Sequence, residues 1–595
     1  MTKQFISTKI QLWFIVIISA VFYINTLSNQ FALDDVMVLT ENKSVKQGLS
    51  GFGDIITKDG FYGYVGDVND LSGGRWRPLS LLVFATEYQI FEDNPAVYHL
   101  TNFLLYILCC VVFYKLLTKY IFRSNAVAAF IAALIFAIHP VHTEVVANIK
   151  SLDEILSLLF LLSTLYFSLE YISDDRKKIN LVKALACYAF ALLSKENGIT
   201  FLFIIPLTFY FFTNKNARER LLYYLPFLLV GVIYLLIRFT FFGAGGHPTA
   251  ILNAPFLYAN FQQQLATKTL ILGKYLLLLF IPYPLSCDYS YNQIPYVDFS
   301  SVYVWIVILI YVALFSFALI NVKRKNVFAY GILFFLFSIS IVSNFLVDIG
   351  ATMGERFLFQ PSVGFAICIG LLLSAVFSIK KYTKATWYFL GLITVLAGCI
   401  ILPRNRDWES SEKLFLQDVK NSPNNLRLNL NAGTQYIAYA DADSTQKEMY
   451  LGKALVYLQR AIQIHPGTVE PYLNAGIVYQ RLGSIDSAES YWNQARSIEP
   501  DNYKLHEYDS FLSLVYLNKG MKAAKTDKDF TKGILYIQKS INYQSTADNW
   551  CDLGAIYFAM GNYKEAKVNF AKALAINPNH PMAKGGYADA SSRIK

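Results

Sequence analysis

The pattern of hydrophobic and polar residues divides the chain into two parts. Up to about Leu402, apolar runs of roughly 15–22 residues alternate with polar loops, and beyond it the polarity rises to that of a soluble protein. A run of that length crosses a hydrocarbon core about 30 Å thick as a helix. We therefore predict an all-α chain, with a polytopic bundle over residues 1–402, a linker over 403–428 and a helical repeat domain over 429–595.

Eleven membrane spans are predicted from these runs. They lie at residues 10–28, 98–120, 124–139, 154–172, 180–194, 199–213, 221–242, 301–321, 327–347, 361–379 and 385–402. One further apolar stretch, residues 267–281, contains Lys268 and Lys274. Counting it as a crossing would place the basic segment Lys323–Lys325 outside the cytoplasm. We predict a re-entrant or interfacial segment instead, which is tolerated where protein covers the backbone.

Basic loops give the orientation. Short loops rich in Lys and Arg face the cytoplasm in membrane proteins, and here they hold Lys119 and Arg123, residues 174–178, 215–220, 323–325 and 380–384. The first apolar run has no small-residue cleavage site after it, so we expect an uncleaved first span. Residues 28–97 and 243–300 then form extracytoplasmic loops. An odd number of spans places the repeat domain outside the cytoplasm.

The last third carries tetratricopeptide repeats. Val469–Asn502 and Ala547–His580 are each 34 residues long and place small residues where two antiparallel helices touch. In the second, Trp550, Gly554, Tyr557, Ala566 and Pro578 hold expected positions of the pattern. Weaker units precede each of them, near Asn429–Pro466 and Glu507–Ser545. About four repeats would form an α-solenoid that commonly binds peptides.

Composition and charge fit this division. The chain is 55% hydrophobic and only 16% charged, which is too apolar for an ordinary soluble protein. Its net charge of +10 comes mostly from short loops between apolar runs, so we do not expect nucleic-acid binding. Cysteine spacing indicates neither a disulfide framework nor a metal site.

Polar clusters near the apolar runs share the extracytoplasmic face in this topology. They are Asp34-Asp35, Arg75 with Arg77, His139 with His142 and Glu144, Asp153, Lys195-Glu196, Asp288 and Glu355-Arg356. Ionisable groups beside membrane spans are costly, so several on one face indicate function. Carboxylates, Arg, Lys and an apolar cavity suit the transfer of a group from a lipid-linked phosphate. Cations stabilise the departing phosphate while a carboxylate takes the proton of the attacking hydroxyl.

The order of these motifs resembles that of GT-C glycosyltransferases, and within them the transmembrane and tetratricopeptide-repeat O-mannosyltransferases. The resemblance runs through Phe31–Val36, Trp76–Leu79, His139–Glu144, Ser194–Asn197, Pro284–Ser290, Glu355–Ser362 and Arg404–Trp408, followed by the repeats. It implies an inverting transfer of a sugar from a polyprenyl phosphate carrier to Ser or Thr hydroxyls of exported proteins. It also implies that no metal or other cofactor takes part.

The resemblance assigns roles to particular residues. It places the catalytic base at Asp34 or Asp35, with Asp34 favoured, against the alternative that both cap a helix or pair with Arg75. Donor phosphate would be bound by Arg356 and Arg77, with Lys195 and Arg75 as further candidates. Substrate contacts are expected from His139, His142, Glu144, Asp153, Glu196, Asp288 and Glu355. A metal site at the histidines is disfavoured because Pro140 breaks the helix and no third ligand is evident.

The source and acceptor stay open at this point. Lys-rich and Asn-rich loops suit a bacterial inner membrane, which would make the carrier undecaprenyl-based and place the repeats in the periplasm. In a eukaryote the repeats would lie in the lumen of the endoplasmic reticulum. The sugar need not be mannose, and the donor could be a lipid-linked oligosaccharide. Competing hypotheses are a lipid or surface polysaccharide as acceptor, and a non-catalytic envelope scaffold. A transporter is disfavoured because the polar groups gather at one membrane face.

Overall fold

The computed structural model describes residues 7–66, 75–173, 177–243, 250–379 and 383–594. Residues 174–176 and 380–382, which belong to two of the predicted basic loops, lie outside the described residues. Within the described ranges the regular secondary structure is helical, so the all-α prediction is confirmed. The chain divides into two compact units, Met1–Ala432 and Gly433–Lys595, with the division inside one helix.

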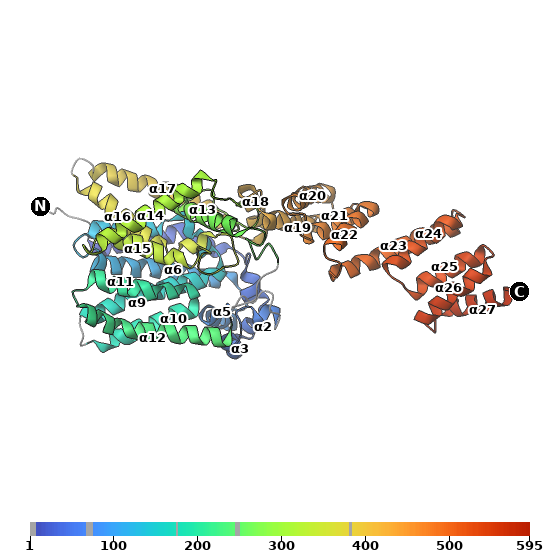
Figure 1. Cartoon of the computed structure of the whole chain (residues 1–595), viewed down its shortest axis with the longest axis horizontal. Helices are drawn as coiled ribbons and strands as arrows, with labels where there is room; N and C mark the ends of the chain where they lie inside the picture. The colour runs from blue at the N-terminus through green and yellow to red at the C-terminus, as the bar shows by residue number, and fades with distance from the viewer. Residues whose placement is uncertain (1–6, 67–74, 174–176, 244–249, 380–382, 595) are drawn as a thin grey trace. The chain divides into compact units, whose positions relative to one another are not determined.

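The first unit is a bundle of apolar helices (Figure 1). Its helices are α1 (Thr8–Tyr23), α6 (Pro95–Leu116), α7 (Ala126–Ala137), α9 (Leu152–Ser173), α10 (Lys178–Ser194), α11 (Phe201–Phe212), α12 (Ala217–Phe241), α14 (Val302–Val322), α15 (Val327–Ser340), α16 (Ser362–Ser378) and α17 (Thr383–Asp407). In α9, 67% of the most apolar window is buried inside the protein, against 17% in both α12 and α14. Helix α9 is therefore central, and the outer helices present apolar side chains outward, as membrane-facing helices do.

A helix occupies each of the eleven predicted spans, but the helices differ in length. Among the described residues six are long and apolar enough to cross a membrane, or seven if the bent pair Ala126–Ala137 and Pro140–Ala147 counts as one span. The others are shorter, such as α11 and α15. Helix α15 ends at Ser340, before the predicted limit of 347, and Asn344 beyond it has a left-handed backbone with φ of 62°. The chain is a multi-pass membrane protein whose span count is approximate.

Small residues let three bundle helices approach closely. A Cβ at Gly364 of α16 would lie 2.4 Å from the carbonyl oxygen of Gly331 in α15. A Cβ at Gly370 would lie 2.6 Å from Cβ of Ala132 in α7. Close backbone approach at small residues is the packing that stabilises helix pairs in a membrane, where lipid is as apolar as the helices.

Helix α13 (Phe261–Phe280) covers the stretch that the sequence left as re-entrant or interfacial. Near its start, Lys268 Nζ lies 3.2 Å from Asp348 Oδ1. Near its end, the carbonyl oxygen of Leu279 lies 3.0 Å from His139 Nε2. Asp348 and His139 both belong to loops at the end of the bundle that carries the polar clusters. Contacts at one end of the bundle from both halves of α13 favour a helix that does not cross it.

That end of the bundle, which we call the site end, is built from short helices and turns. They include η2 (Val36–Thr40), α2 (Lys43–Lys46), α3 (Phe52–Thr57), α4 (Tyr62–Val65), α5 (Pro78–Phe91), η5 (Pro140–His142), α8 (Thr143–Ala147), η6 (Ile149–Ser151), η7 (Glu196–Thr200), η8 (Glu355–Leu358) and α18 (Ser411–Asn421). Between α7 and the following helical residues the chain bends by 49°, at Pro140. The bend leads the chain into α8, which carries Glu144.

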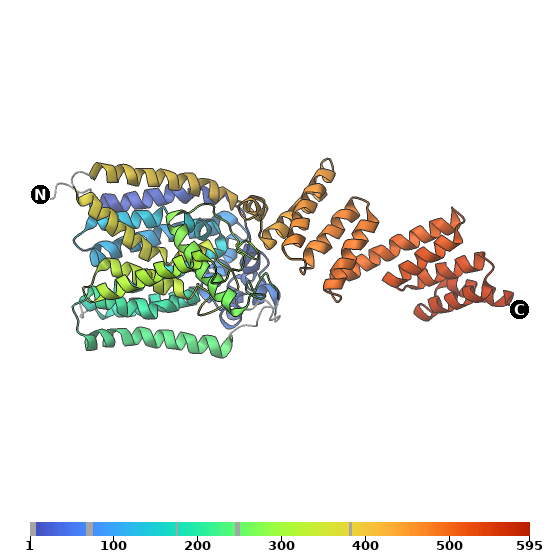
Figure 2. The same cartoon turned by 45° about the horizontal axis from the view of Figure 1, so that its top comes forward.

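The second unit consists of antiparallel helix pairs (Figure 2). The pairs are α19 (Leu426–Ala442) with α20 (Lys447–Ile464), α21 (Glu470–Arg481) with α22 (Ile485–Ile498), α23 (Lys504–Lys525) with α24 (Phe530–Tyr543), and α25 (Ala547–Ala559) with α26 (Tyr563–Ile576), followed by α27 (Pro581–Arg593). Helix α19 begins in the first unit. The two strong repeats of the sequence correspond to α21–α22 and α25–α26.

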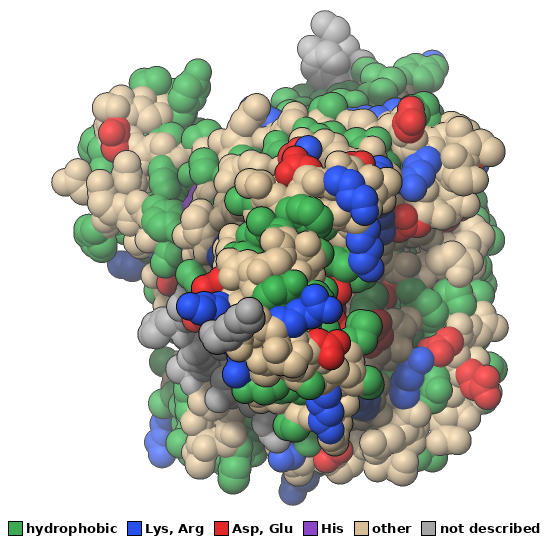
Figure 3. All heavy atoms as spheres, turned by 90° about the vertical axis from the view of Figure 1, so that its right-hand side faces the viewer, with side chains coloured by type: hydrophobic (Ala, Val, Ile, Leu, Met, Phe, Trp, Pro, Cys, Tyr) green, Lys and Arg blue, Asp and Glu red, His purple; other side chains and the backbone are tan. Residues whose placement is uncertain are grey.

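Glycines explain how the helices of a pair pack. Gly476 faces Trp492, and a Cβ there would lie 2.1 Å from the indole Nε1. Gly554 faces Phe570 in the same way, with a would-be contact of 2.8 Å. Glycine leaves room for a large side chain of the partner helix. The glycine and the large residue of the repeat pattern are therefore the two residues that meet in this contact. Figure 3 shows Lys and Arg interspersed with Asp and Glu on the face in view, which is typical of a solvated surface.

Candidate active site

The loop after the first helix presents two adjacent aspartates to different surroundings. Leu33 has a left-handed backbone with φ of 53°, which is uncommon for a non-glycine residue and turns the chain sharply. The Asp35 carboxylate closes this turn, accepting the N–H of Ala32 at 2.8 Å and the N–H of Lys150 at 2.8 Å. Asp35 is fully buried, and burial raises its pKa to about 7. Asp35 therefore fixes the loop against the start of α9.

Asp34 has the opposite character. Its side chain is half-buried and makes no hydrogen bond or ion pair with the described residues. Burial raises its pKa, but the positive charges of Lys150, Arg356, Arg75 and Arg427 outweigh burial and hold the pKa below its ordinary value. Asp34 is thus an ionised, unpartnered carboxylate in a positive field.

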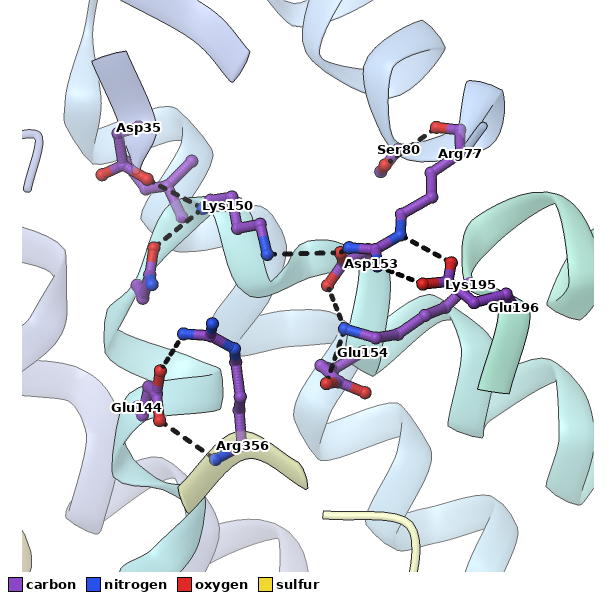
Figure 4. A network of polar contacts seen from close by, with 12 residues as sticks. Asp35, Arg77, Ser80, Glu144, Lys150, Asp153, Glu154, Lys195, Glu196 and Arg356 are labelled. Carbon is purple, nitrogen blue, oxygen red and sulfur yellow. Dashed lines mark hydrogen bonds and ion pairs between the residues drawn. The ribbon is translucent and has the colours of Figure 1, made fainter. Parts of the chain in front are cut away.

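Arg77 lies beside two carboxylates. It directly precedes α5, whose first residue is Pro78, a favourable residue at that helical position. Its Nη1 donates to Asp153 Oδ2 at 2.7 Å, and its Nε donates to Glu196 Oε2 at 2.8 Å (Figure 4). A guanidinium held this way is already neutralised by protein carboxylates.

Lys195 is paired in the same manner. Its Nζ lies 2.6 Å from Glu154 Oε1 and 3.5 Å from Asp153 Oδ1. Asp153 and Glu154 stand in the first turn of α9, where helix N-termini favour negative charge. Lys150 contacts the same group less closely, with Nζ 3.6 Å from Asp153 Oδ2. Asp153 is therefore shared among Arg77, Lys195 and Lys150, as Figure 4 shows.

Arg356 is held by one carboxylate from a distant part of the sequence. Glu144 accepts the backbone N–H of Arg356 at 3.0 Å and its Nη1 at 2.5 Å. Glu144 is fully buried, whereas the Arg356 side chain keeps 18% of its surface exposed. The other guanidinium nitrogens make no further hydrogen bond with the described residues, so Arg356 is anchored at one end and open at the other.

Arg75 has no carboxylate partner among the described residues. Its guanidinium lies over the Phe61 ring, 5.1 Å from the centroid. Burial and the neighbouring charge of Arg77 lower its pKa, which is what an uncompensated cation near another cation experiences. Arg75, Lys150 and Arg356 are consequently the cations of the site least neutralised by protein groups.

The two histidines brace the fold. His142 is fully buried, with Nδ1 3.0 Å from the Tyr106 hydroxyl and Nε2 2.9 Å from Ser362 Oγ. His139 Nε2 lies 3.0 Å from the Leu279 carbonyl oxygen. In the part of the chain that the structure describes, no three His, Cys, Asp or Glu residues form a group that could hold a metal ion. The ring nitrogens are engaged with neighbouring elements.

Asp288 and Glu355 hold the loop over residues 282–300. Asp288 Oδ1 accepts the N–H of Ser290 at 2.6 Å and Asn425 Nδ2 at 2.7 Å. Glu355 Oε1 accepts the N–H of Ser286 at 2.5 Å and the Tyr289 hydroxyl at 2.8 Å. Glu355 is fully buried, and burial raises its pKa to about 8. Both residues are tied into backbone contacts.

The structure thus sorts the candidate residues from the sequence into two sets. One set surrounds Asp34 directly or through shared ion pairs: Arg75, Arg77, Glu144, Asp153, Lys195, Glu196 and Arg356. The other set supports the surrounding loops: Asp35, His139, His142, Asp288 and Glu355. Glu154 and Lys150 are members of this network to which the sequence analysis gave no role. Lys150 lies three positions before Asp153, a spacing that brings side chains together on a helix and could have indicated it, whereas Glu154 directly follows Asp153 and its contact with Lys195 depends on the fold.

Comparisons with known proteins agree with this division of the chain. Residues 78–243 match the family described as dolichyl-phosphate-mannose-protein mannosyltransferase, and residues 547–580 match the tetratricopeptide repeat. The first match covers Glu144, Lys150, Asp153, Lys195 and Glu196, whereas Asp34 and Arg356 lie outside it.

Matches to individual proteins extend further along the chain. The human protein O-mannosyl-transferase TMTC3 is 24% identical over 641 aligned residues, covering 94% of this chain and 67% of that protein. The protein O-mannosyl-transferase F38B6.6 of Caenorhabditis elegans is 27% identical, covering 70% of this chain and 58% of its own length. Human protein O-mannosyl-transferase TMTC1 is 26% identical, with 77% and 55% covered. The chain thus spans between about half and two thirds of these relatives.

Proposed function

Since this chain resembles the TMTC protein O-mannosyl-transferases along nearly all of its length, we propose that it is a membrane-bound glycosyltransferase that acts on proteins. The donor in this proposal is a sugar linked to a polyprenyl phosphate, either a mannose-like monosaccharide or an oligosaccharide. The acceptors are Ser and Thr hydroxyls of exported proteins. The observation that carries the proposal is the Asp34 carboxylate, which makes no hydrogen bond or ion pair with the described residues and lies in the positive field of Lys150, Arg356 and Arg75.

The proposed reaction is a single displacement, as the resemblance implies. Asp34 takes the proton of the acceptor hydroxyl. At the same time the oxygen of that hydroxyl attacks the anomeric carbon of the sugar, from the side opposite the phosphate. The bond between the anomeric carbon and the phosphate oxygen breaks, and its electron pair leaves with the phosphate. The configuration at the anomeric carbon is inverted. General-base help of this kind contributes about 10²–10⁴-fold to a rate.

Charge on the departing phosphate would be stabilised by the three least compensated cations, Arg75, Lys150 and Arg356. They come from three separated segments, so the fold rather than the sequence brings them together. Preorganised cations of this sort act where charge develops in the transition state. In this proposal the cations provide the charge stabilisation that a metal ion would otherwise give, and no metal is required.

Arg77 and Lys195 take a different part from the one expected from the sequence alone. Each already lies against two carboxylates, so we assign them to holding Asp153, Glu154 and Glu196 in place. Asp153 and Glu196 keep lone pairs that can accept hydrogen bonds from sugar hydroxyls. Glu144 fixes Arg356 through its backbone and its side chain.

The surroundings assign the remaining parts. Apolar outer helices suit a lipid-anchored donor whose phosphate lies at the site end. In this proposal the site end and the repeats lie outside the cytoplasm, as the basic loops of the sequence predict, which is the periplasm if the source is bacterial, with undecaprenyl phosphate as carrier. The repeat unit would bind the acceptor polypeptide, the common role of such repeats.

Glycoproteomics of cells lacking this protein tests the proposal. We expect one glycan to disappear from Ser and Thr of many exported proteins, to return with the wild-type chain and to stay absent with Asp34→Asn. A chain truncated after Ala432 separates the acceptor classes, because protein glycosylation should fall while modification of a lipid or polysaccharide would persist. Unchanged protein glycans in the deletion would contradict the proposal.

A further inference from the structure

The segment between the bundle and the repeat unit does more than join them. Residues 403–428 were predicted to be a linker, yet they include the end of α17, all of α18 and the start of α19. We propose that residues Arg404–Asn429, here called the connector, form a bracket. The bracket holds two parts of the candidate active site in fixed positions: the loop that carries Asp34 and the loop over residues 282–300. In this bracket Ser411 and Asp418 are positioning residues. Only the kinetic part of this inference rests on the proposed glycosyltransferase function.

One arm of the bracket holds the loop that carries Asp34. The N–H of Leu33 donates to Ser411 Oγ at 2.8 Å, next to Asp34 in the sequence. The N–H of Gln30 donates to the carbonyl oxygen of Glu409 at 2.8 Å. These bonds hold the chain on the N-terminal side of the left-handed Leu33, where an unsupported backbone would relax. Ser411 therefore helps fix where Asp34 stands.

The other arm holds the loop over residues 282–300. The carboxylate of Asp418 is fully buried and accepts the N–H of Cys287 at 2.6 Å. Arg404 Nη2 donates to the same carboxylate at 2.8 Å, from the end of α17. Further bonds run along the loop, from Asn421 Nδ2 to the Leu285 carbonyl oxygen, from Ser422 Oγ to Ser286 Oγ, and from Asn425 Nδ2 to Asp288.

The loop held by this second arm also contacts Glu355, the residue before Arg356. The N–H of Ser286 and the hydroxyl of Tyr289, both on the held loop, donate to Glu355 Oε1. Glu355 precedes Arg356, whose positive charge acts on Asp34 and whose guanidinium is held by Glu144. A continuous set of bonds thus leads from Asp418 to Arg356, while Ser411 leads to Asp34.

Burial indicates that these contacts are persistent. Arg404 is 4% exposed and Asp418 is fully buried, and each charge would be costly to bury without the other. By contrast, Lys420 on helix α18 is exposed and donates a hydrogen bond at 3.2 Å to Gln417 Oε1 within the same helix. Helix α18 therefore offers both bracket residues and a matched control.

The test compares Ser411→Ala, Ser411→Thr, Asp418→Asn and the control Lys420→Ala in the full chain, reconstituted in lipid. Hydrogen exchange measured by mass spectrometry reads the two loops separately. We expect Ser411→Ala to speed exchange at residues 30–36 but not at 285–291, and Asp418→Asn to do the reverse. Ser411→Thr retains the hydroxyl and should restore protection, and Lys420→Ala should match the wild type.

Transfer kinetics give the second readout. We expect kcat to fall about 10-fold in Ser411→Ala and in Asp418→Asn, with KM for the acceptor peptide unchanged and with kcat restored in Ser411→Thr. Unchanged exchange in both loops, or faster exchange with unaltered kcat, would overturn the bracket. If the wild-type chain transfers no sugar, the proposed function fails, and the exchange data alone then decide: loop-specific effects support the bracket and their absence overturns it.

Discussion

Asp34 and Asp35 are neighbours in the sequence but differ in what they contact. Asp35 is buried and accepts two backbone N–H groups, whereas Asp34 has no partner among the described residues. The resemblance to the O-mannosyltransferases indicated that one of this pair is the base, and two adjacent carboxylates after an apolar run fit that hypothesis. The sequence could not separate their roles, since the left-handed turn at Leu33 and the contact with Lys150 arise from the fold.

Substituting each aspartate should therefore give different losses. Asp34→Asn should lower kcat by at least about 100-fold and change thermal unfolding much less than Asp35→Asn does, because its carboxylate interacts with the cations only through their field and makes no hydrogen bond with the described residues. In Asp35→Asn one of the two carboxylate oxygens is replaced by an NH₂ group, so one of the buried N–H groups of Ala32 and Lys150 loses its acceptor. The free energy of unfolding should fall by about 1–3 kcal/mol. Transfer assays and thermal melts on both variants measure this. Equal losses of stability in both would show that Asp34 is structural.

Substitutions of Arg75 and Arg77 should also differ in their effects on transfer and on stability. Arg75→Ala removes a cation without a carboxylate partner among the described residues and should impair transfer with little change in the melting temperature. Arg77→Ala removes the guanidinium that pairs with Glu196 and one of the three cations around Asp153, and it should destabilise the fold by up to about 3–5 kcal/mol, the usual cost of breaking a buried pair. Melting curves beside donor-dependent rates distinguish them. If Arg77→Ala were as stable as the wild type, the supporting role given to Arg77 would be wrong.

Glu355 gives a prediction about pH. Burial raises its pKa to about 8, while the ordinary value is 4.5, so the folded chain binds more protons than the unfolded chain between these values. Stability that is present below about pH 4.5 is then lost as the pH rises toward 8, by at most about 5 kcal/mol. Glu355→Gln retains the oxygen that accepts from Ser286 and cannot ionise, so its stability should depend less on pH. The measurement is the free energy of unfolding of the wild type and of Glu355→Gln as a function of pH. If both change with pH in the same way, the prediction is wrong.

At the scale of elements, the length of apolar runs predicted the bundle helices well. What it could not give was where helices end inside the membrane, because that depends on neighbours. Helix α15 ends early where the chain turns at Asn344. The weaker repeat at Glu507–Ser545 lacked a full signature, yet α23 and α24 form a pair in which Gly520 faces Ile537. The contact between a glycine and a large side chain, which is common to the strong repeats, is therefore present in this weaker repeat too.

Helix α13 is the element whose placement decides the topology. If it does not cross the bundle, cysteines introduced at Phe261 and Tyr283, which are 73% and 68% exposed, should react with an impermeant thiol reagent from the same side of the membrane. A cysteine at Arg324, between α14 and α15, should react only from the other side. Sealed vesicles of known orientation provide the measurement. Labelling of the two α13 sites from opposite sides would make α13 a span.

At the scale of the whole molecule, a membrane bundle with a polar end is followed by a repeat unit. This organisation was predictable from the switch between long apolar runs and the 34-residue period. The bonding of the connector to the loops of the bundle was not, because those bonds join residues more than 100 positions apart in the sequence, as in Asp418 with Cys287 and Ser411 with Leu33. Sequence order alone indicated a linker there.

The central claim is that Asp34 and its surrounding cations transfer a sugar from a polyprenyl phosphate to a hydroxyl with inversion. The most direct test supplies the reconstituted protein with a polyprenyl-phosphate mannose of known anomeric configuration and a peptide containing Ser and Thr. The glycopeptide is then analysed by mass spectrometry and NMR. We predict a glycosidic bond of the opposite configuration, formed by the wild type and not by Asp34→Asn. A product of retained configuration, or equal transfer by both proteins, would contradict the account.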